Sequence, residues 1–409
     1  MKPGALSNIR VLDLSRILAG PWASQILGDM GADVIKIERP GQGDDTRGWA
    51  PPFLADAQGN PTEMSAYFMC VNRNKRSITV DMATEEGQKI IRALAQESDV
   101  VIENFKKGGL TQYHLDYESL KAINPQLVYC SITGFGQDGP YAERAGYDFL
   151  IQGMGGLMSI TGRPDTEPGG GPMKVGVALT DVLTGLYAAN AIQAALLWRE
   201  KSGQGQYIDL ALLDVQVACL ANQAMNYLVS GNPPGRLGNS HPNIVPYQDF
   251  PTQDGYMLLA IGNDGQFARF CKEAGQPELA ADSRFVTNKD RVINRAALVP
   301  LLNVLTVKRT TAQWIASLES LAVPCGPVNN LEQVFDNEQV RARGLKVEIL
   351  DRKLDQKVPS VASPLRLSET PPVYRRSPPH LGEHTEEVLV TVLGMSPKEI
   401  EELHQRNIV

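Results

Sequence analysis

Short runs of β-branched residues alternate with amphipathic stretches over the first third of the chain. Extended patterns fall at five places, residues 9–14, 32–38, 77–82, 99–105 and 126–136. Helical patterns lie between them, from Ala19 to about Gly31 and over residues 84–98. This alternation predicts βαβ units, so we expect an α/β fold in which helices cover both faces of a parallel sheet.

The pattern changes beyond residue 175. Here we expect a helix, a strand and a second helix, at 181–200, 207–213 and 214–231. A loop-rich segment at 232–250 then leads into a smaller mixed α/β region that ends near Asn330. The proline-rich stretch 368–389 is typical of an extended linker, and a last helix is expected at 396–407.

Ligands of parallel sheets bind beyond the carboxyl ends of the strands. Arg39, Asp81, Asn104 and Phe105 fall at such ends in the predicted pattern. A dinucleotide site is disfavoured, because the turn in "LDLSRILAGPWAS" has one glycine where G-x-G-x-x-G needs three. The chain also has neither a phosphate-binding P-loop motif nor a G-x-S-x-G elbow, so ATP and serine-hydrolase chemistry lose support as well.

Composition narrows the choice of partners. The 409 residues are 43% hydrophobic and 21% charged, which suits a globular protein with room for two domains. A net charge of −7 provides no general attraction for nucleic acid or an anionic membrane. No signal-peptide pattern and no long apolar run is seen, so we expect a cytoplasmic protein. The five cysteines and five histidines show no metal-binding spacing, and no metal is expected.

One carboxylate stands near the front of the apolar stretch "GVALTDVLTGLYAANAIQAAL". Asp181 could simply cap the predicted helix, where a carboxylate accepts backbone N–H bonds and favours the positive end of the helix dipole. It could instead be a nucleophile, since apolar neighbours and a helix start provide a partly dehydrated site for a reactive carboxylate. Spacing alone leaves both readings open.

Several motifs, in order over nearly the whole chain, carry a resemblance to a known family. They are "VLDLSRILAGPWASQILGDMGADVIKIERPGQGDDTRGW", "NRNKRSITVDM", "DVVIENF", "SITGFGQDGPY", "GYDFLIQGMGGLMSITG", "GVALTDVLTGLYAANAI" and "PPHLGEHTEEVL". The sequence resembles the family III CoA-transferases, a superfamily that also includes the α-methylacyl-CoA racemases. The resemblance implies a large Rossmann-like CoA-binding domain formed by residues 1–225 and, after a linker, by the returning segment 336–409. It also implies a small α/β domain at 226–335 and an interlocked homodimer.

The resemblance implies a chemistry as well. The aspartate of this motif, Asp181, would attack the acyl-CoA donor, and CoA would pass to a carboxylic acid through an aspartyl anhydride and an aspartyl-CoA thioester. Thioester energy is conserved, so the reaction needs no metal, no nucleoside triphosphate and no cofactor beyond coenzyme A itself as substrate. The phrases "RAGYD" and "GNSHPNIVPYQ" resemble the succinyl-CoA:dicarboxylate branch. We therefore expect succinyl-CoA as donor and a dicarboxylate as acceptor.

Site residues follow from matching the family motifs position by position. The residues implied for the coenzyme are Arg39, Val80, Asp81, Met82, Asn104, Phe105, Lys106, Arg144, Tyr147 and Asp148. The residues expected at the acyl group or its oxyanion are Arg16, Leu18, Trp49, His241, Gly262, Gly265 and Gln266. For His241 a purely structural role is an equal alternative, and the glycine segment also reads as a common turn.

Three alternatives remain beside dicarboxylate transfer. A transferase of the same family could use a carnitine-type or short monocarboxylic acid. A racemase would need a histidine beside its aspartate, and the motif G-H-D of racemases is replaced here by Gly146-Tyr147-Asp148. A non-catalytic acyl-CoA-binding protein would have no need to keep Asp181.

Overall fold

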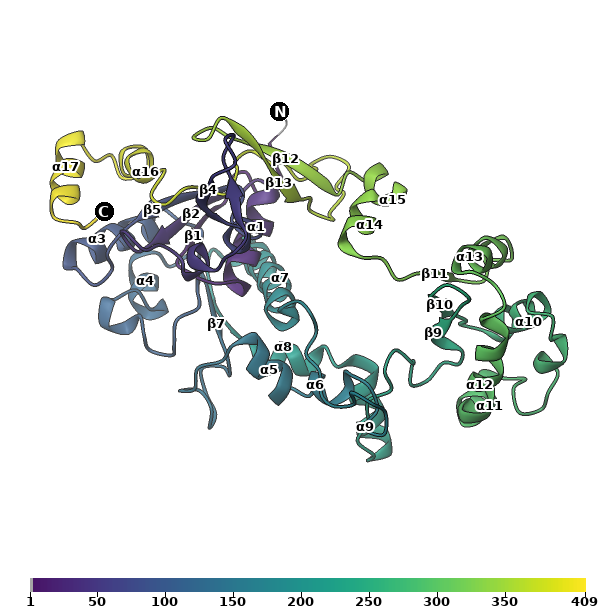
Figure 1. Cartoon of the computed structure of the whole chain (residues 1–409). Coiled ribbons are helices and arrows are strands. Elements are labelled where there is room, and N and C mark those ends of the chain that lie inside the picture. Colours follow the sequence, from purple (N-terminus) through teal and green to yellow (C-terminus); the bar gives the residue numbers. More distant parts are fainter. Residues whose placement is uncertain (1–2) are drawn as a thin grey trace. The chain divides into compact units, whose positions relative to one another are not determined.

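The structure is a computed structural model that describes residues 3–409 (Figure 1). The chain divides into two compact units, each built from separated segments. Unit 1 comprises the residues up to Gly156 together with Val175–Ala224 and Gln339–Val409. Unit 2 comprises Leu157–Lys174 and Met225–Glu338.

Unit 1 is built on a six-stranded parallel sheet with the strand order β5-β2-β1-β6-β7-β8. The strands are β1 (Arg10–Asp13), β2 (Asp33–Glu38), β5 (Lys75–Thr79), β6 (Val100–Glu103), β7 (Val128–Thr133) and β8 (Tyr207–Ala211). Their residues alternate between two hydrophobic cores: Val11 packs into one and Leu12 into the other. Apolar side chains on both faces are what a parallel sheet covered by helices on both sides requires. The predicted fold class, a mixed α/β fold with a parallel central sheet, is confirmed.

Helices cover each face of this sheet (Figure 1). One core is closed by α1 (Ala19–Asp29) and α7 (Leu179–Ser202), which pack directly on each other. Their close approach depends on Gly185, because a Cβ there would lie 2.7 Å from the carbonyl oxygen of Ala19. The other core is closed by α3 (Glu85–Gln96), α4 (Tyr117–Ile123), α16 (Thr385–Thr391) and α17 (Pro397–Gln405).

The remaining elements of unit 1 surround this framework. Two antiparallel hairpins stand beside the sheet, β3 (Phe53–Ala55) with β4 (Pro61–Ser65) and β12 (Lys346–Asp351) with β13 (Gln356–Val361). The short helical elements are η1 (Asp45–Gly48), α2 (Ala66–Met69), η2 (Thr111–Tyr113), α5 (Asp148–Met154) and α8 (Leu212–Ala218). Two further helices cross the unit boundary, α9 (Ala221–Ser230) and α15 (Glu338–Ala342).

Unit 2 has a core of its own. Its three-stranded antiparallel sheet has the order β11-β10-β9, with β9 (Tyr247–Pro251), β10 (Tyr256–Ala260) and β11 (Cys325–Pro327). Buried aromatic residues, among them Phe250, Phe270 and Trp314, fill the space beside the sheet. The helical elements are α6 (Leu157–Ile160), α10 (Asp264–Glu273), η3 (Pro277–Ala280), α11 (Asn288–Ile293), α12 (Arg295–Thr306), α13 (Thr311–Ser320) and α14 (Leu331–Asp336).

Three local predictions were wrong. The extended linker expected at 368–389 stops before Thr385, because residues 385–389 already belong to α16. The single helix expected at 214–231 is two helices, because α8 ends at Ala218 and Ala221 takes a positive φ of 46° before α9 continues. The strand expected at 207–213 ends at Ala211, since Leu212 already begins α8. Within the described residues 3–409, no helix is both long and apolar enough to cross a membrane.

Candidate active site

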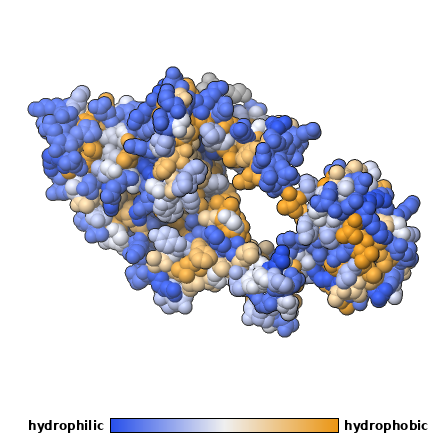
Figure 2. Space-filling model, viewed as in Figure 1, coloured by the Kyte–Doolittle hydropathy of each residue, from blue (hydrophilic) through white to orange (hydrophobic). Residues whose placement is uncertain are grey.

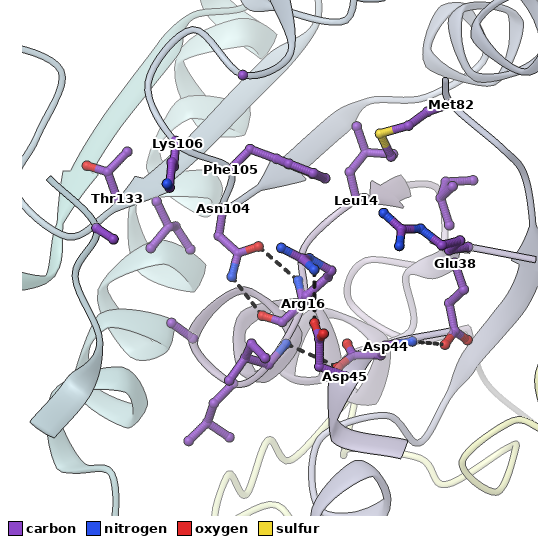
Figure 3. A pocket seen from close by; sticks show the side chains of 18 of the residues that line it. Leu14, Arg16, Glu38, Asp44, Asp45, Met82, Asn104, Phe105, Lys106 and Thr133 are labelled. Atoms are coloured by element: carbon purple, nitrogen blue, oxygen red, sulfur yellow. Dashed lines mark hydrogen bonds and ion pairs between the residues drawn. The ribbon is translucent and has the colours of Figure 1, made fainter. Parts of the chain in front are cut away.

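A cavity of about 720 Å³ opens at the carboxyl ends of the strands of unit 1 (Figure 3). Segments that follow β1, β2, β5, β6 and β7 all contribute to its lining. The sequence-predicted site residues that line it are Arg16, Leu18, Arg39, Val80, Asp81, Met82, Asn104, Phe105, Lys106, Arg144, Tyr147 and Asp181. Residues from widely separated motifs therefore meet in one cavity, at the edge where parallel sheets bind ligands.

Buried charges support the floor of this cavity. The Lys36 ammonium is fully buried and donates to the Ser15 carbonyl and, at 2.9 Å, to the Asp44 carboxylate. Burial by itself would raise the pKa of Asp44, but Lys36 and the Thr46 donors outweigh it and lower that pKa to about 2. Asp44 stays ionised at any pH at which the protein works, so this ion pair is a permanent part of the cavity wall.

A second buried pair lies deeper, between Asp13 at the end of β1 and Lys75 at the start of β5. Asp13 accepts hydrogen bonds from Lys75 at 3.1 Å and from the hydroxyls of Ser15 and Ser24. Lys75 also donates to the Pro21 carbonyl and to the side chain of Asn72. Every buried charge here is hydrogen-bonded, which is the condition for keeping ions inside a core.

The loop between β1 and α1 has a strained backbone that two side chains hold in place. Ile17 has a φ of 70°, a conformation that β-branched residues rarely adopt. Asn104 accepts from the Arg16 N–H at 2.9 Å and donates to the Arg16 carbonyl at 2.7 Å, while Asp44 accepts from the Ile17 N–H. Figure 3 shows these contacts with Arg16 beside Asn104. The Asn104 amide thus fixes the loop that presents Arg16 and Leu18 to the cavity.

Cationic groups surround the rest of the cavity. Arg16 pairs with Asp45 at 2.9 Å and lies over the Phe105 ring, with about half of its side chain exposed. Arg39 donates to Gln42, and Arg144 stacks on Tyr141 with 4.7 Å between guanidinium and ring centre. Together with Lys106 they give an acidic protein a local positive lining, as an anionic ligand would require.

Asp181 occupies the first turn of α7 and lines the cavity. Burial raises the pKa of its carboxyl to about 7, with a further contribution from the charge of Asp148. Asp181 does not cap the helix, because Ala178 occupies the cap position and no side chain of the helix itself caps the turn. Asp181 is therefore a half-buried, poorly solvated carboxylate that faces a ligand-sized cavity.

Two predicted residues of unit 1 are not among those that line the cavity. Asp148 is buried and accepts from the Thr180 N–H at 2.8 Å and from Gln152. Trp49 is 46% exposed and packs edge-on against the ring of Tyr67, with 5.2 Å between the centroids. Sequence reasoning missed Tyr67. Burial and the nearby charge of Asp181 raise the pKa of its phenol to about 12, so it stays a neutral hydroxyl near the carboxylate.

The other predicted residues belong to unit 2. The Gly262 N–H donates to the Gln266 side chain at 2.8 Å, in the segment that Asn263 caps as α10 begins. Gly265 lies in the first turn of that helix. His241 accepts from the Asn243 N–H and packs on Tyr247, and burial together with Arg295 lowers its pKa. His241 is thus held neutral in a turn.

Among residues 3–409, no group of three or more histidine, cysteine or acidic side chains is disposed to hold a metal ion. Two of the acidic residues that line the cavity are paired with cations, Asp44 with Lys36 and Glu38 with Arg47 at 2.7 Å.

Comparisons with known proteins agree with this geometry. A family model described as CoA-transferase family III matches residues 6–385. The chain is 54% identical to a succinate–glutarate CoA-transferase of Agrobacterium fabrum, over 94% of each chain. It is 46% identical to a succinyl-CoA:glutarate CoA-transferase of Mus musculus, over 98% of this chain and 89% of the mouse protein.

A solved structure shows the same fold. It is a CAIB/BAIF family protein from Brucella suis that is 52% identical and superposes with a TM-score of 0.84, covering 96% of this chain and all of that one. A family match over most of the sequence and a relative above 50% identity leave no ambiguity about the class of enzyme. The chain belongs to CoA-transferase family III, and it is a CoA-transferase.

Proposed function

We propose that this CoA-transferase moves CoA from succinyl-CoA to a dicarboxylic acid such as glutarate, with Asp181 as the covalent nucleophile. The observation that carries the proposal is the position of Asp181, a poorly solvated carboxylate on the wall of a cavity lined by cations. Relatives named for succinate and glutarate support the choice of acids. Only a carboxylate can form both acyl intermediates that such an exchange requires.

The proposed reaction balances without an external energy source. An oxygen of Asp181 attacks the thioester carbon of succinyl-CoA, the C–S bond breaks, and CoA leaves as the thiolate. The thiolate then attacks the Asp181 carbonyl of the mixed anhydride, releasing succinate and leaving an aspartyl-CoA thioester. The acceptor carboxylate reverses both steps and departs as its CoA ester, which regenerates the Asp181 carboxylate.

The cationic lining suits the coenzyme. In the proposal, Arg39 and Lys106 take the phosphates of CoA, while Val80, Asp81 and Met82 line the adenine pocket beyond β5. Arg144, Tyr147 and Phe105 contact the remainder of the coenzyme along the cavity. Arg39 now donates only to an exposed glutamine, so a phosphate can replace that partner at little cost.

Charge that develops on the thioester oxygen needs hydrogen-bond donors. We assign this role to the segment of Gly262, Gly265 and Gln266. The Gly262 N–H is already bonded to the Gln266 side chain, so donation to an oxyanion requires that bond to open. We also assign to His241, which is held neutral in its turn, a contact with the acyl group of the substrate.

The proposed assembly is a homodimer. Large apolar side chains remain exposed on neighbouring elements of unit 1, among them Leu197 and Trp198 of α7 and Phe149 and Met154 of α5. Figure 2 shows hydrophobic side chains on the visible face of unit 1 near α5. A patch of this kind is typical of a protein interface, and a second copy of the chain would cover it.

An acceptor panel tests the proposed substrates. With succinyl-CoA as donor, we expect glutarate and substituted succinates to be converted to CoA esters faster than formate, oxalate or carnitine. Leu18 lines the cavity with an apolar side chain, whereas a very small acid would need a polar group at this place in the loop. Product CoA esters are separated and quantified by chromatography. Faster transfer to formate or to carnitine than to any dicarboxylate would contradict the proposed acceptor class.

Arg16→Met should reduce dicarboxylate transfer by ~10–200-fold, which corresponds to the loss of a hydrogen bond between charged groups, while a monocarboxylate of equal length is almost unaffected. The Arg16–Asp45 pair is half exposed and so stabilises the fold by only about 0–1 kcal/mol. Arg16 can therefore exchange Asp45 for the distal carboxylate of the acceptor. Rates for matched acids measure the effect, and Asp45→Asn is the control, expected to keep dicarboxylate transfer. Equal losses for both acids would instead assign Arg16 to the coenzyme or to the loop.

A further inference from the structure

The helix that carries Asp181 begins without a capping side chain of its own. Ala178 stands at the cap position of α7, so the N–H groups of the first turn need an acceptor from elsewhere. Asp148, the first residue of α5, supplies it. One of its oxygens accepts from the Thr180 N–H at 2.8 Å and lies 3.4 Å from the Asp181 nitrogen. These are the second and third N–H groups of the helix, the positions at which a cap normally acts.

Two buried glutamines brace this contact. Gln152, one turn after Asp148 on α5, is fully buried and donates to the other Asp148 oxygen at 2.7 Å. Its carbonyl oxygen accepts from the Val175 N–H, so it also holds the segment that leads into α7. On the far side, the Thr180 hydroxyl donates to Gln216 of α8 at 2.7 Å. Asp148 is thus fixed in place against the turn that presents Asp181.

Other charged side chains line the same cavity, among them the cations Arg16, Lys106 and Arg144, but Asp148 is the one whose charge acts on the pKa of Asp181. Tyr67 of α2 also faces Asp181, but burial and the charge of Asp181 keep its phenol neutral. The titratable groups on the other elements packed against α7 are bound elsewhere, buried as neutral groups or exposed. They are Asp29 of α1, paired with Arg73; Tyr129 and Cys130 of β7; Tyr207 and Asp209 of β8; and Asp214 of α8. Asp148 is therefore the negative charge that acts on the nucleophile.

We propose that Asp148 is a positioning residue for the transfer reaction: it holds the first turn of α7, and its buried negative charge raises the lowest pH at which Asp181 can react as a nucleophile. The inference rests on the proposed function, in which Asp181 reacts as a carboxylate. Burial and the Asp148 charge together raise the pKa of Asp181 to about 7. A more basic carboxylate is a better nucleophile once ionised, and it stays protonated to a higher pH.

Asp148→Asn tests the charge while keeping an oxygen for the Thr180 N–H. We expect the acidic limb of the kcat/KM profile to move to lower pH by at least about half a unit, because a like charge has been removed beside Asp181. The rate on the alkaline plateau should fall, since the nucleophile is then less basic. An acidic limb that stays at the wild-type pH in a folded Asp148→Asn enzyme would overturn the proposal.

Gln152→Met is the matched control. Asp148→Asn also disturbs the contact with Gln152, because two amide N–H groups would then face each other. Gln152→Met loses the same hydrogen bond without a change of charge, so we expect a lower Tm and an unshifted limb. A purely structural role for Asp148 would give both variants the same pH profile.

A second variant keeps the proposal testable if Asp148→Asn does not fold. Asp148→Ser removes the same negative charge with a smaller polar side chain and should likewise move the acidic limb to lower pH. An unmoved limb would count against the proposal here as well. Full activity of Asp181→Asn would instead remove the proposed function itself, so the two failures are distinguishable.

Discussion

Asp181→Asn should abolish CoA transfer, by at least roughly 10³-fold in kcat, and at the same time raise the Tm of the protein at pH 8. The loss follows because an amide oxygen cannot form the acyl anhydride that the proposed route requires. Wild-type enzyme incubated with succinyl-CoA and then hydroxylamine should carry the adduct on Asp181, which peptide mass spectrometry detects. The variant should carry none.

The gain in stability follows from the sign of the pKa shift. The Asp181 pKa is about 7 in the folded chain and 3.8 without the fold. Between these values the folded state holds a proton that the unfolded chain has lost, so the free energy of unfolding falls as the pH rises from about 4 to about 7 and is constant above that. Asparagine removes this cost, which is on the order of 1–4 kcal/mol at pH 8 and close to zero at pH 4.

The control for both effects is Asp214→Asn, which changes an exposed carboxylate on α8. It should leave activity and the Tm at pH 8 nearly as in wild type. Transfer at the wild-type rate by Asp181→Asn would rule out the covalent route. If Asp181→Asn and wild type have the same Tm at pH 8 as well as at pH 5, Asp181 is better solvated than its pKa indicates.

Asp13→Ala should destabilise unit 1 by about 3–5 kcal/mol, the cost of leaving a buried charge without its partner. The change removes the carboxylate that accepts hydrogen bonds from the Lys75 ammonium and from the hydroxyls of Ser15 and Ser24. Lys75 already has a pKa lowered by burial to about 8, so without Asp13 it should give up its proton well below that pH. The measurement is urea denaturation, with the signal of unit 1 fitted separately.

An exposed pair provides the comparison for Asp13→Ala. Lys89 and Glu85 lie one turn apart on α3, with 62% and 75% of their side chains exposed. Lys89→Ala should cost only about 0.3–0.5 kcal/mol. If Asp13→Ala lowers the free energy of unfolding by no more than this exposed control, water must reach the Asp13–Lys75 pair, and the pair would not be a buried support beneath the cavity.

The inner strands of the central sheet could be predicted from the sequence because they are buried on both faces, so every residue of a run such as Val100–Ile102 is apolar. The hairpin of β12 and β13 was not foreseen. Its strands carry charged residues such as Lys346 and Glu348 on the exposed face, and its register depends on pairing between residues that no local pattern reveals.

The residues of the candidate site were also predicted only in part. Motif resemblance placed Asp181, Arg39 and the turn after β5 in one cavity, as the structure shows. Whether each residue contacts substrate stays a prediction. Tyr67 was missed because its proximity to Asp181 arises from tertiary packing of α2, not from any spacing in the sequence. Charge runs in a sequence usually face water, yet Arg73, Lys75 and Arg76 of "NRNKRS" are buried partners of aspartates.

The discontinuous make-up of unit 1 has a consequence for synthesis on the ribosome. Ile400, Leu403 and Ile408 belong to the same core as Leu12, and the Asp81 N–H beside the proposed adenine pocket donates to the Ile408 carbonyl. This core cannot close until the last of these residues has left the exit tunnel, whereas the main segment of unit 2, Met225–Glu338, emerges earlier in one piece. During translation the nascent chain therefore exposes an unfinished parallel sheet until its C-terminal segment has been released.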